Sequence, residues 1–286
     1  MPTAAKPEEL EHKLPFDPPS VELVRTVIEP YRRYFAPQFF GMENVDKDKP
    51  SLYVNNHAVM GLFDGSLFGA EIYEKKGIFL RSLMDNIHFE LPVWRSLVKT
   101  LGGGVLGTRS NCAELMKQKE HILVYPGGGR EVCKKKGEAY VLTWKNRLGF
   151  ARMAIEYGYP IIPVATLGTE DTYRILADSD DIMNSKLGQF LKEKGFAQKF
   201  FKDGDHIPPI VRGIGFTPFP KPVKFYIKAG APIDTTRFNG LYEDEQVLWQ
   251  LRQEVELAMY KLLEELMAIR DADTDVPMWR KLLSKL

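Results

Sequence analysis

Short apolar runs alternate with segments of helical periodicity through the middle of this chain. The runs are too short for helices and are bounded by turn residues, so they predict buried strands. We expect strands at Leu52–Val54, Ile78–Leu80, His121–Tyr125, Tyr159–Leu167 and Val223–Lys228. Helical spacing predicts helices at Asp64–Lys75, at Leu148–Tyr157 and from a Ser110 cap to Lys117. This alternation predicts an α/β fold with a mixed, largely parallel sheet flanked by helices on both faces.

Amphipathic segments stand near both ends of the chain. After Ser20, a predicted N-cap, apolar residues recur at helical spacing opposite arginines. Glu243–Ile269 predicts a long amphipathic helix, and Pro277–Leu286 sets tryptophan and leucines opposite basic residues. The first segment either lies in a membrane interface or covers the protein's own core. The last is either an interfacial anchor or a packed or frayed tail, and the sequence leaves these possibilities open.

Composition excludes several classes of protein. The 286 residues are 44% hydrophobic, which is enough for one core, and a net charge of +1 argues against a nucleic-acid partner. Cys112 and Cys133 have no metal-ligand spacing, so we expect free thiols and no metal. No apolar run approaches the roughly 20 residues that span a bilayer, and residues 1–13 lack a signal-peptide core. We expect a cytoplasmic protein, either free or peripheral to a membrane.

The strand at Leu52–Val54 leads into two asparagines and His57, with Asp64 seven residues further on. A histidine at the carboxyl end of a strand, with a carboxylate nearby, is typical of general-base catalysis. The carboxylate fixes the tautomer of the imidazole and stabilises its protonated form. The alternative is a loop histidine beside a helix-capping aspartate.

A glycine-rich turn follows the strand at His121–Tyr125 and contains Gly127, Gly128, Gly129, Arg130 and Glu131. Glycines leave backbone amides accessible, so this turn suits an anion or a developing oxyanion. Arg130 adds a guanidinium whose planar fork matches phosphate. A tight surface turn is the alternative. The run Lys134–Lys136 is either a solvated face or a phosphate contact.

Gly102, Gly104 and Gly107 match the dinucleotide fingerprint, but they follow a helix-like segment and not a strand. We interpret them as a turn into another strand, which ends at Thr108-Arg109. In α/β sheets, sites gather beyond the carboxyl ends of the strands. His57, Arg109, the glycine turn and Gly168–Glu170 all follow predicted strands, so we expect them at one edge of the sheet.

Four motifs together resemble the glycerolipid acyltransferases, which include lysophosphatidic acid acyltransferases and diacylglycerol acyltransferase-like proteins. The resemblance covers roughly residues 39–234, with the motifs in the family order. They are Asn56-His57 with Asp64, Gly104–Arg109, Tyr125–Glu131 and Ile162–Val164.

The resemblance implies transfer of a fatty acyl group from acyl-CoA or acyl carrier protein to a lipid hydroxyl, without a cofactor. His57 would deprotonate the hydroxyl and Asp64 would orient the imidazole. Arg109 and Arg130 would hold phosphate beside the glycine turn. It also implies three parts: an N-terminal arm and helix at 1–38, an acyltransferase domain at 39–240, and C-terminal helices at 241–286.

Two departures from the family pattern affect these expectations. Six residues separate His57 from Asp64 where the family has four. A continuous helix would separate the two by about 10.5 Å, so a direct contact requires a bend, which we expect at Gly61. Asp85 is the alternative partner of His57. Gly127 stands where the family has glutamate, which makes a neutral acceptor such as diacylglycerol or a fatty alcohol credible beside a lysophospholipid.

Two other functions remain open from the sequence. A lipid ester or thioester hydrolase would use His57 to activate water, although the chain lacks the GxSxG elbow of serine hydrolases. A non-catalytic lipid-binding protein would keep the fold and lose the chemistry.

Overall fold

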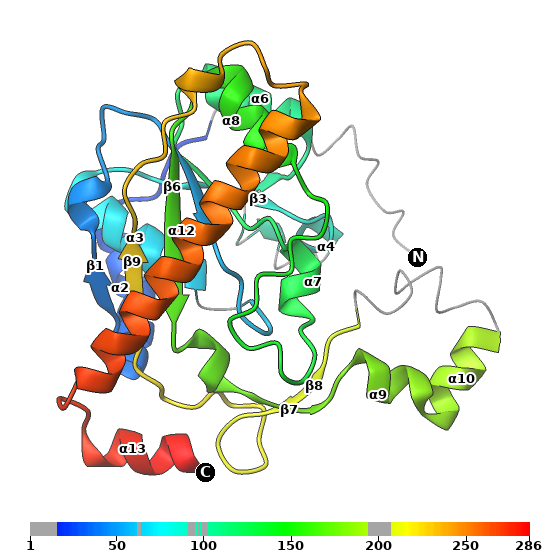
Figure 1. Ribbon diagram of the computed structural model, residues 1–286. Coiled ribbons are helices and arrows are strands. Elements are labelled where there is room, and N and C mark those ends of the chain that lie inside the picture. The colour runs from blue at the N-terminus through cyan, green and yellow to red at the C-terminus, as the bar shows by residue number, and fades with distance from the viewer. Residues whose placement is uncertain (1–15, 62–63, 91–94, 97, 99–101, 194–206) are drawn as a thin grey trace.

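A computed structural model describes residues 16–61, 64–90, 95–96, 98, 102–193 and 207–286. Its centre is a seven-stranded sheet in the order β1-β9-β6-β2-β5-β3-β4 (Figure 1). The strands in chain order are β1 (Gln38–Phe40), β2 (Leu52–Asn55), β3 (Arg81–Met84), β4 (Val105–Leu106), β5 (Ile122–Val124), β6 (Ile161–Leu167) and β9 (Tyr226–Ala229).

Most neighbouring strands of this sheet are parallel. β2 lies between β5 and β6 and is parallel to both, while β3 is parallel to β4 and β5. β9 runs antiparallel to β6, and β1 pairs parallel to β9 at the edge of the sheet. β6 is buried at every position, as expected for a strand covered on both faces. The mixed, largely parallel sheet predicted from the sequence is confirmed.

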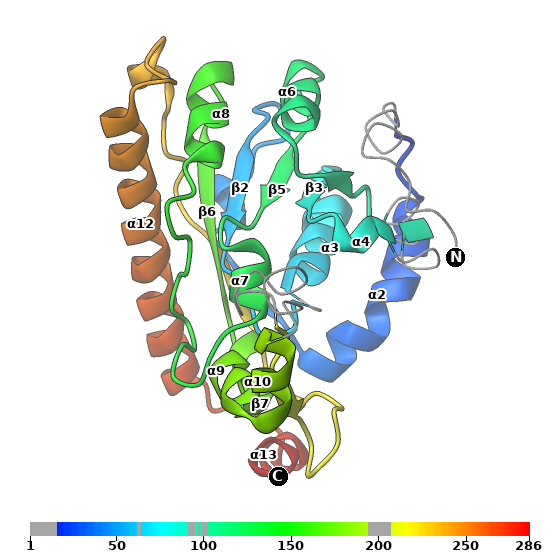
Figure 2. The ribbon, with the colours of Figure 1, turned by 90° about the vertical axis from the view of Figure 1, so that its right-hand side faces the viewer.

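Helices cover both faces of the sheet, as predicted. Figure 2 shows the sheet between α8 and α12 on one side and α2 and α3 on the other. Because strand side chains alternate, Leu52 and Val54 of β2 pack towards α6, α8 and α12, whereas Tyr53 packs towards α2 and α3. These helices are α2 (Val21–Phe35), α3 (Asp64–Lys76), α6 (Arg109–Lys117), α8 (Gly149–Tyr157) and α12 (Glu245–Ala272).

Shorter elements surround this framework. β7 and β8 pair antiparallel as a separate two-stranded sheet. The elements are η1 (Met42–Asn44), α4 (Ile87–Glu90), α7 (Gly128–Val132), η2 (Thr169–Thr172), β7 (Arg174–Ala177), α9 (Ser179–Asn184), α10 (Lys186–Glu193), β8 (Ile210–Arg212), η4 (Thr236–Phe238) and α13 (Met278–Lys285).

Several element boundaries differ from the sequence prediction. The strand expected at Ile78–Leu80 is displaced to Arg81–Met84, because the apolar residues before it are buried against α3 without pairing. The strand expected at Val223–Lys228 likewise begins at Tyr226. Thr108 caps α6 in place of Ser110, since its side chain accepts from the amide of Asn111.

The β7–β8 pair was not predicted. β7 lies in a polar segment, and β8 begins a segment rich in glycine and proline. β7 alternates between exposed and half-buried positions, so it has no continuous apolar run to reveal it. Among the residues described, no helix combines the length and the apolar character needed to cross a membrane.

The two faces of α12 provide a test of this packing. Leu251 is fully buried and Leu257 is 69% exposed on the same helix. Leu251→Ala should lower the free energy of unfolding by about 2–5 kcal/mol, because it removes buried methyl groups and leaves a cavity. Leu257→Ala, the matched control, should change it by less than about 0.5 kcal/mol. Urea denaturation measures both, and equal effects would contradict the packing described.

Candidate active site

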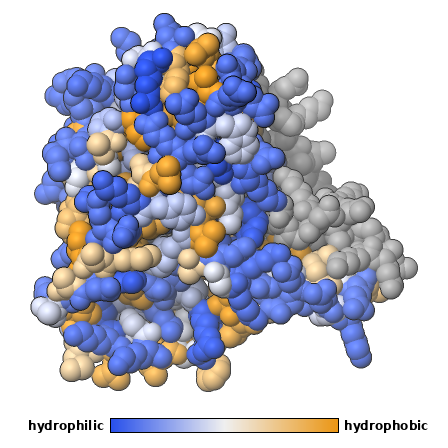
Figure 3. Space-filling model, in the orientation of Figure 1, coloured by the Kyte–Doolittle hydropathy of each residue, from blue (hydrophilic) through white to orange (hydrophobic). Residues whose placement is uncertain are grey.

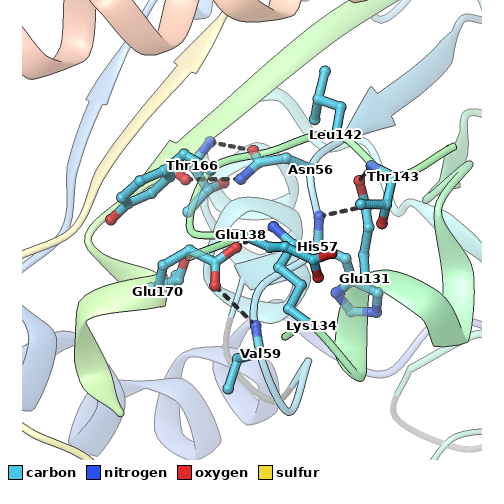
Figure 4. A network of polar contacts seen from close by, with 12 residues as sticks. Asn56, His57, Val59, Glu131, Lys134, Glu138, Leu142, Thr143, Thr166 and Glu170 are labelled. Atoms are coloured by element: carbon cyan, nitrogen blue, oxygen red, sulfur yellow. Dashed lines mark hydrogen bonds and ion pairs between the residues drawn. The ribbon is translucent and has the colours of Figure 1, made fainter. Parts of the chain in front are cut away.

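His57 lies in the loop that follows β2, the strand between β5 and β6. Its backbone amide donates a hydrogen bond to Oε2 of Glu131, at 3.1 Å. Its imidazole stacks on Tyr125, with the ring centroids 4.1 Å apart. Tyr125 directly follows β5 and Glu131 lies in α7, so His57 contacts residues on both sides of the glycine turn. Figure 4 shows His57 and Glu131 together.

A second buried carboxylate holds the same loop two residues further on. The amide of Val59 donates to Oε2 of Glu170, at 3.3 Å, and Nζ of Lys134 donates to Oε1. Oε1 of Glu131 accepts from the amide of Thr143, at 3.0 Å. Figure 4 shows these side chains gathered around the His57 loop.

The two carboxylates and the lysine are removed from water. Glu131 is 0% exposed and Lys134 is 1% exposed. Burial raises the pKa of Glu131 and of Glu170, and the positive charge of Lys134 opposes both shifts. A buried charge is costly unless it is paired and hydrogen-bonded. The loop amides that meet these carboxylates therefore help to stabilise them, which fixes the path of the loop.

Buried amide side chains fix the start of the loop. Asn56 donates from Nδ2 to the carbonyl of Thr166, at 3.0 Å, and accepts from the Thr166 amide at Oδ1, at 2.8 Å. The Thr166 hydroxyl donates to Oδ1 of Asn55, at 3.3 Å. Both asparagines are fully buried. They continue the pairing of β2 with β6 past the last ladder bond, so they set where His57 emerges.

The loop then bends, as a direct contact between His57 and Asp64 would require. Met60 and Gly61 have φ values of 67° and 57°. A Cβ at Gly61 would lie 2.6 Å from Cε1 of His57, so glycine also lets the chain pass close to the imidazole. The expected bend at Gly61 is confirmed, and Met60 shares it.

The carboxylate partner of His57 stays a prediction. Asp64 is the first residue of α3, and its side chain lies outside the description. Asp85 is exposed, and its carboxylate accepts from the Ile87 amide at 3.2 Å. The pKa of His88 is lowered, chiefly by burial. The charge of Asp85 opposes this shift, and the charge of His57 adds to it.

Gly127 has a specific steric role. A Cβ there would overlap the carboxyl group of Glu131, which folds back over the glycine. Gly128 has φ of +46° and its amide donates to the carbonyl of Tyr125, at 3.0 Å. α7 begins at Gly128 and includes Gly129. Gly127 therefore makes room for Glu131, and Gly128 turns the chain sharply after β5.

The residues predicted to bind substrate make contacts within the protein. Arg130 donates to Glu138, at 2.5 Å. The guanidinium of Arg109 pairs with Glu156 and Glu243, at 3.0 and 3.3 Å. No contact described here joins Arg109 to the His57 loop. Both carboxylate oxygens of Glu131 accept hydrogen bonds from backbone amides. Glu131 therefore positions the loop, and its predicted contact with substrate stays a prediction. Phosphate binding by the two arginines stays a prediction.

Sequence reasoning missed three contributors to the site. Tyr125 was assigned to a strand end and to the motif Tyr125–Glu131 without a role of its own, and Thr166 was one more residue of a predicted buried strand. Lys134 read as part of a basic run, either solvated or meeting phosphate, whereas it is buried and paired with Glu170. Glu170 was noted at a strand end without a role. Nothing in the local sequence distinguishes Lys134 or Glu170, because each has a charged neighbour and the two are 36 residues apart.

Sequence comparison with a known family extends over most of the chain. Residues 20–275 match the family described as diacylglycerol acyltransferase. The chain belongs to this family. The match includes the sheet, the His57 loop, the glycine turn and α12.

Named relatives of this diacylglycerol acyltransferase family member include two plant proteins. Phytyl ester synthase 2, chloroplastic, of Arabidopsis thaliana is 29% identical over 81% of this chain and 34% of its own length. Phytyl ester synthase 1 of the same plant is 31% identical over 79% of the chain and 34% of its own length. A Bos taurus protein named DGAT1/2-independent enzyme synthesizing storage lipids is 31% identical over 54% of this chain and 43% of its own length. The chain thus spans about a third of each plant protein.

A solved structure shares the fold. The 1-acyl-sn-glycerophosphate (LPA) acyltransferase PlsC from Thermotoga maritima aligns with a TM-score of 0.51 and 18% identity. The alignment covers 86% of this chain and 79% of the other.

Gly127→Ala tests the contact between the glycine turn and Glu131. The added methyl group should displace the carboxylate from the His57 and Thr143 amides, and lower the free energy of unfolding by about 1–3 kcal/mol. Gly149→Ala is the control, because a Cβ there meets nothing within 4 Å. Denaturant unfolding measures both, and an undestabilised Gly127→Ala protein would contradict the packing.

Proposed function

We propose that this chain transfers a fatty acyl group from a thioester donor, acyl-CoA or acyl carrier protein, to a hydroxyl of a glycerolipid or long-chain alcohol. The observation that carries this proposal is the placement of His57 on a rigid loop against the glycine turn, at the carboxyl ends of parallel strands. Family membership supports acyl transfer as the reaction class. The names of the relatives support ester synthesis on lipid acceptors.

His57 acts as the general base in this proposal. Its imidazole takes the proton of the acceptor hydroxyl as that oxygen attacks the thioester carbonyl. The tetrahedral intermediate then collapses, the carbon–sulfur bond breaks, and the imidazolium returns the proton to the leaving thiolate. No acyl-enzyme forms, because a thioester is already activated. General-base catalysis of this kind typically contributes about 10²–10⁴-fold.

The glycine turn supplies electrostatic stabilisation in the proposal. Tyr125 and Glu131, which flank the turn at Gly127–Arg130, both contact His57, so we place the developing oxyanion at this turn. Removal of one oxyanion donor typically costs about 3 kcal/mol of barrier. Because Glu131 and Glu170 fix the loop before substrate arrives, little reorganisation is needed in the transition state.

The acceptor class is broader than lysophospholipids in this proposal. Gly127 stands where the lysophosphatidic acid acyltransferases carry glutamate, and two relatives are named for phytyl esters. We therefore include diacylglycerol and long-chain alcohols among the candidate acceptors, beside lysophospholipids.

We also propose that the protein works at a membrane surface. Exposed apolar side chains gather on α13 and on the loop after β8, and Figure 3 shows hydrophobic residues along the lower edge of the molecule. Phe216 is 92% exposed. Figure 1 shows β6 pointing towards the end where α13 lies, so this surface is at the active-site end. The other residues are Phe219, Met278, Trp279, Leu282 and Leu286.

One buried arginine joins α13 to the rest of this surface. Arg280 is 3% exposed and donates to the carbonyls of Tyr34 and Pro222. Tyr34 in turn contacts the ring of Phe219 edge-on, with centroids 5.6 Å apart. α13, the end of α2 and the loop before β9 therefore form one surface. Lys281 and Lys285 are exposed beside it and suit anionic lipid.

Activity with a panel of acceptors tests the reaction. Purified protein is offered labelled acyl-CoA with lysophospholipids, diacylglycerol or long-chain alcohols, and products are identified by mass spectrometry. His57→Gln should lower the rate of ester formation by about 10²–10⁴-fold with unchanged thermal unfolding, because only the base is removed. Release of free fatty acid in place of ester would identify a hydrolase. Lipid binding without turnover, unaffected by His57→Gln, would identify a binding protein.

Vesicle sedimentation tests the membrane surface. Trp279→Ser with Leu282→Ser should weaken binding to vesicles of phosphatidylcholine and phosphatidylglycerol by about tenfold or more, since each large side chain contributes about 1.5–3 kcal/mol on burial. Leu257→Ser, exposed on α12, is the control. Point substitutions are preferable to truncation because Arg280 is part of the fold. Equal sedimentation of the three proteins would remove the membrane claim.

A further inference from the structure

A groove lined by basic residues begins beside the His57 loop and leads to the two-stranded sheet of β7 and β8. Its inner part has a volume of about 230 Å³ and is lined by Val59, Lys134 and Glu170 among others. Its outer part, of about 600 Å³, reaches Arg212 of β8. The outer volume is typical of small-molecule sites, which are about 300–1,000 Å³. Three residues line both parts, so the groove is continuous: Lys136, Arg174 and Ile175.

The lysines of the groove are neutralised by the protein. Lys134 pairs with Glu170, and the next two pair with α9: Lys135 with Asp180 and Lys136 with Asp181, each at 2.7 Å. The two pairs with α9 are solvent-exposed and contribute little to stability. An incoming anion can therefore recruit these lysines at small cost.

The arginines of the groove are not neutralised in this way. Within the described part of the chain, neither Arg174 nor Arg212 has a carboxylate within salt-bridge distance. Nε of Arg212 is buried without a hydrogen-bond partner, and its guanidinium lies over the ring of Phe216, 5.3 Å from the centroid. Among the described residues, two guanidinium groups thus line one recess without a salt-bridge partner.

The positive charge of the two arginines also affects the pKa of a neighbouring lysine, Lys221. The pKa of Lys221 is lowered by burial first and then by the charges of Arg212 and Arg174, against a smaller opposing effect of Asp171. Like charges held together in this way destabilise one another until an anion binds between them. A phosphate group matches the planar fork of arginine and accepts paired hydrogen bonds from it.

The floor of the groove is apolar. Ile175 and Leu176 of β7 line its outer part between the two arginines and Lys136. A ligand with a phosphate-bearing end and a long, weakly polar arm matches this arrangement. Its arm would follow the groove inward past Val59, which is two residues from His57.

We propose that this groove binds the phosphate groups of the acyl-CoA donor, with Arg174 and Arg212 as phosphate ligands and the inner end directing the thioester towards His57. The inference rests on the proposed function, because it assigns the donor's position in that reaction. Lipid headgroups also carry phosphate, so the test separates the two sources.

Calorimetric titration with CoA tests the assignment on the full chain. Arg174→Gln and Arg212→Gln should each raise the Kd for CoA roughly tenfold, since one charged hydrogen-bonding group is lost. The KM for acyl-CoA should rise in parallel, while kcat stays unchanged. Arg237→Gln is the matched control, because that arginine is exposed and pairs with Glu254 away from the groove. Arg109→Gln tests the alternative site predicted from the sequence.

The outcomes separate the possible failures. An unchanged Kd for CoA in the double variant, or no CoA binding by the unaltered protein, would overturn the assignment. Loss of binding to vesicles that contain phosphatidic acid, with CoA binding intact, would also overturn it in favour of lipid phosphate. Arg174 is exposed, so Arg174→Gln gives a result even if Arg212→Gln unfolds. Ester formation with normal KM in the variants would reject the groove alone, whereas no ester from the unaltered protein would reject the proposed function.

Discussion

The burial of two carboxylates around one loop is the constraint on which the site depends. Glu131 and Glu170 share the positive charge of Lys134 in surroundings from which water is excluded. One lysine does not neutralise two carboxylates, and the backbone amides of His57, Val59 and Thr143 supply the remaining stabilisation. Breaking a buried pair of this kind typically costs about 3–5 kcal/mol. The loop after β2 is therefore held by a large energetic penalty against any other path.

The sheet turns this local constraint into a precise position. β2 is flanked by parallel strands on both sides, so the segments that follow β2, β5 and β6 emerge at one edge. Asn56 extends the pairing with β6, while Tyr125 and Glu131 meet the loop from the side of β5. Contacts from two neighbouring strands determine both the height and the direction at which His57 leaves the sheet. A rigid approach of this kind suits a base that must meet its proton at hydrogen-bond distance.

Polarity changes in order from the site to the exterior. The carboxylates and Lys134 are buried at the centre, and the arginine-lined groove opens beside them. Beyond β7 and β8, the exposed phenylalanines and leucines of the loop after β8 and of α13 face solvent. In the proposed reaction, a water-borne thioester with phosphates and an acceptor held in lipid require different approaches to one imidazole. We propose the charged groove and the apolar surface as these two approaches.

The sequence by itself determined the fold class, the helices on both faces and the convergence of His57 with the glycine turn. Hydrophobic periodicity and strand length carry that information, because they report burial and the period of each element. It also indicated the bend at Gly61 from the spacing to Asp64. It did not reveal the pairing of β7 with β8, whose residues are half exposed and lack an apolar run.

Only the tertiary structure decided what the charged residues do. Lys134, Glu131 and Glu170 look like surface or ligand-binding residues in the chain, yet they are buried against one another. Whether a charge is solvated, paired or left to bind a ligand depends on partners that lie 36 or more residues away, as for Lys134 with Glu170 and His57 with Glu131. Pairing across such distances is set by strand order and helix packing, which local sequence does not encode.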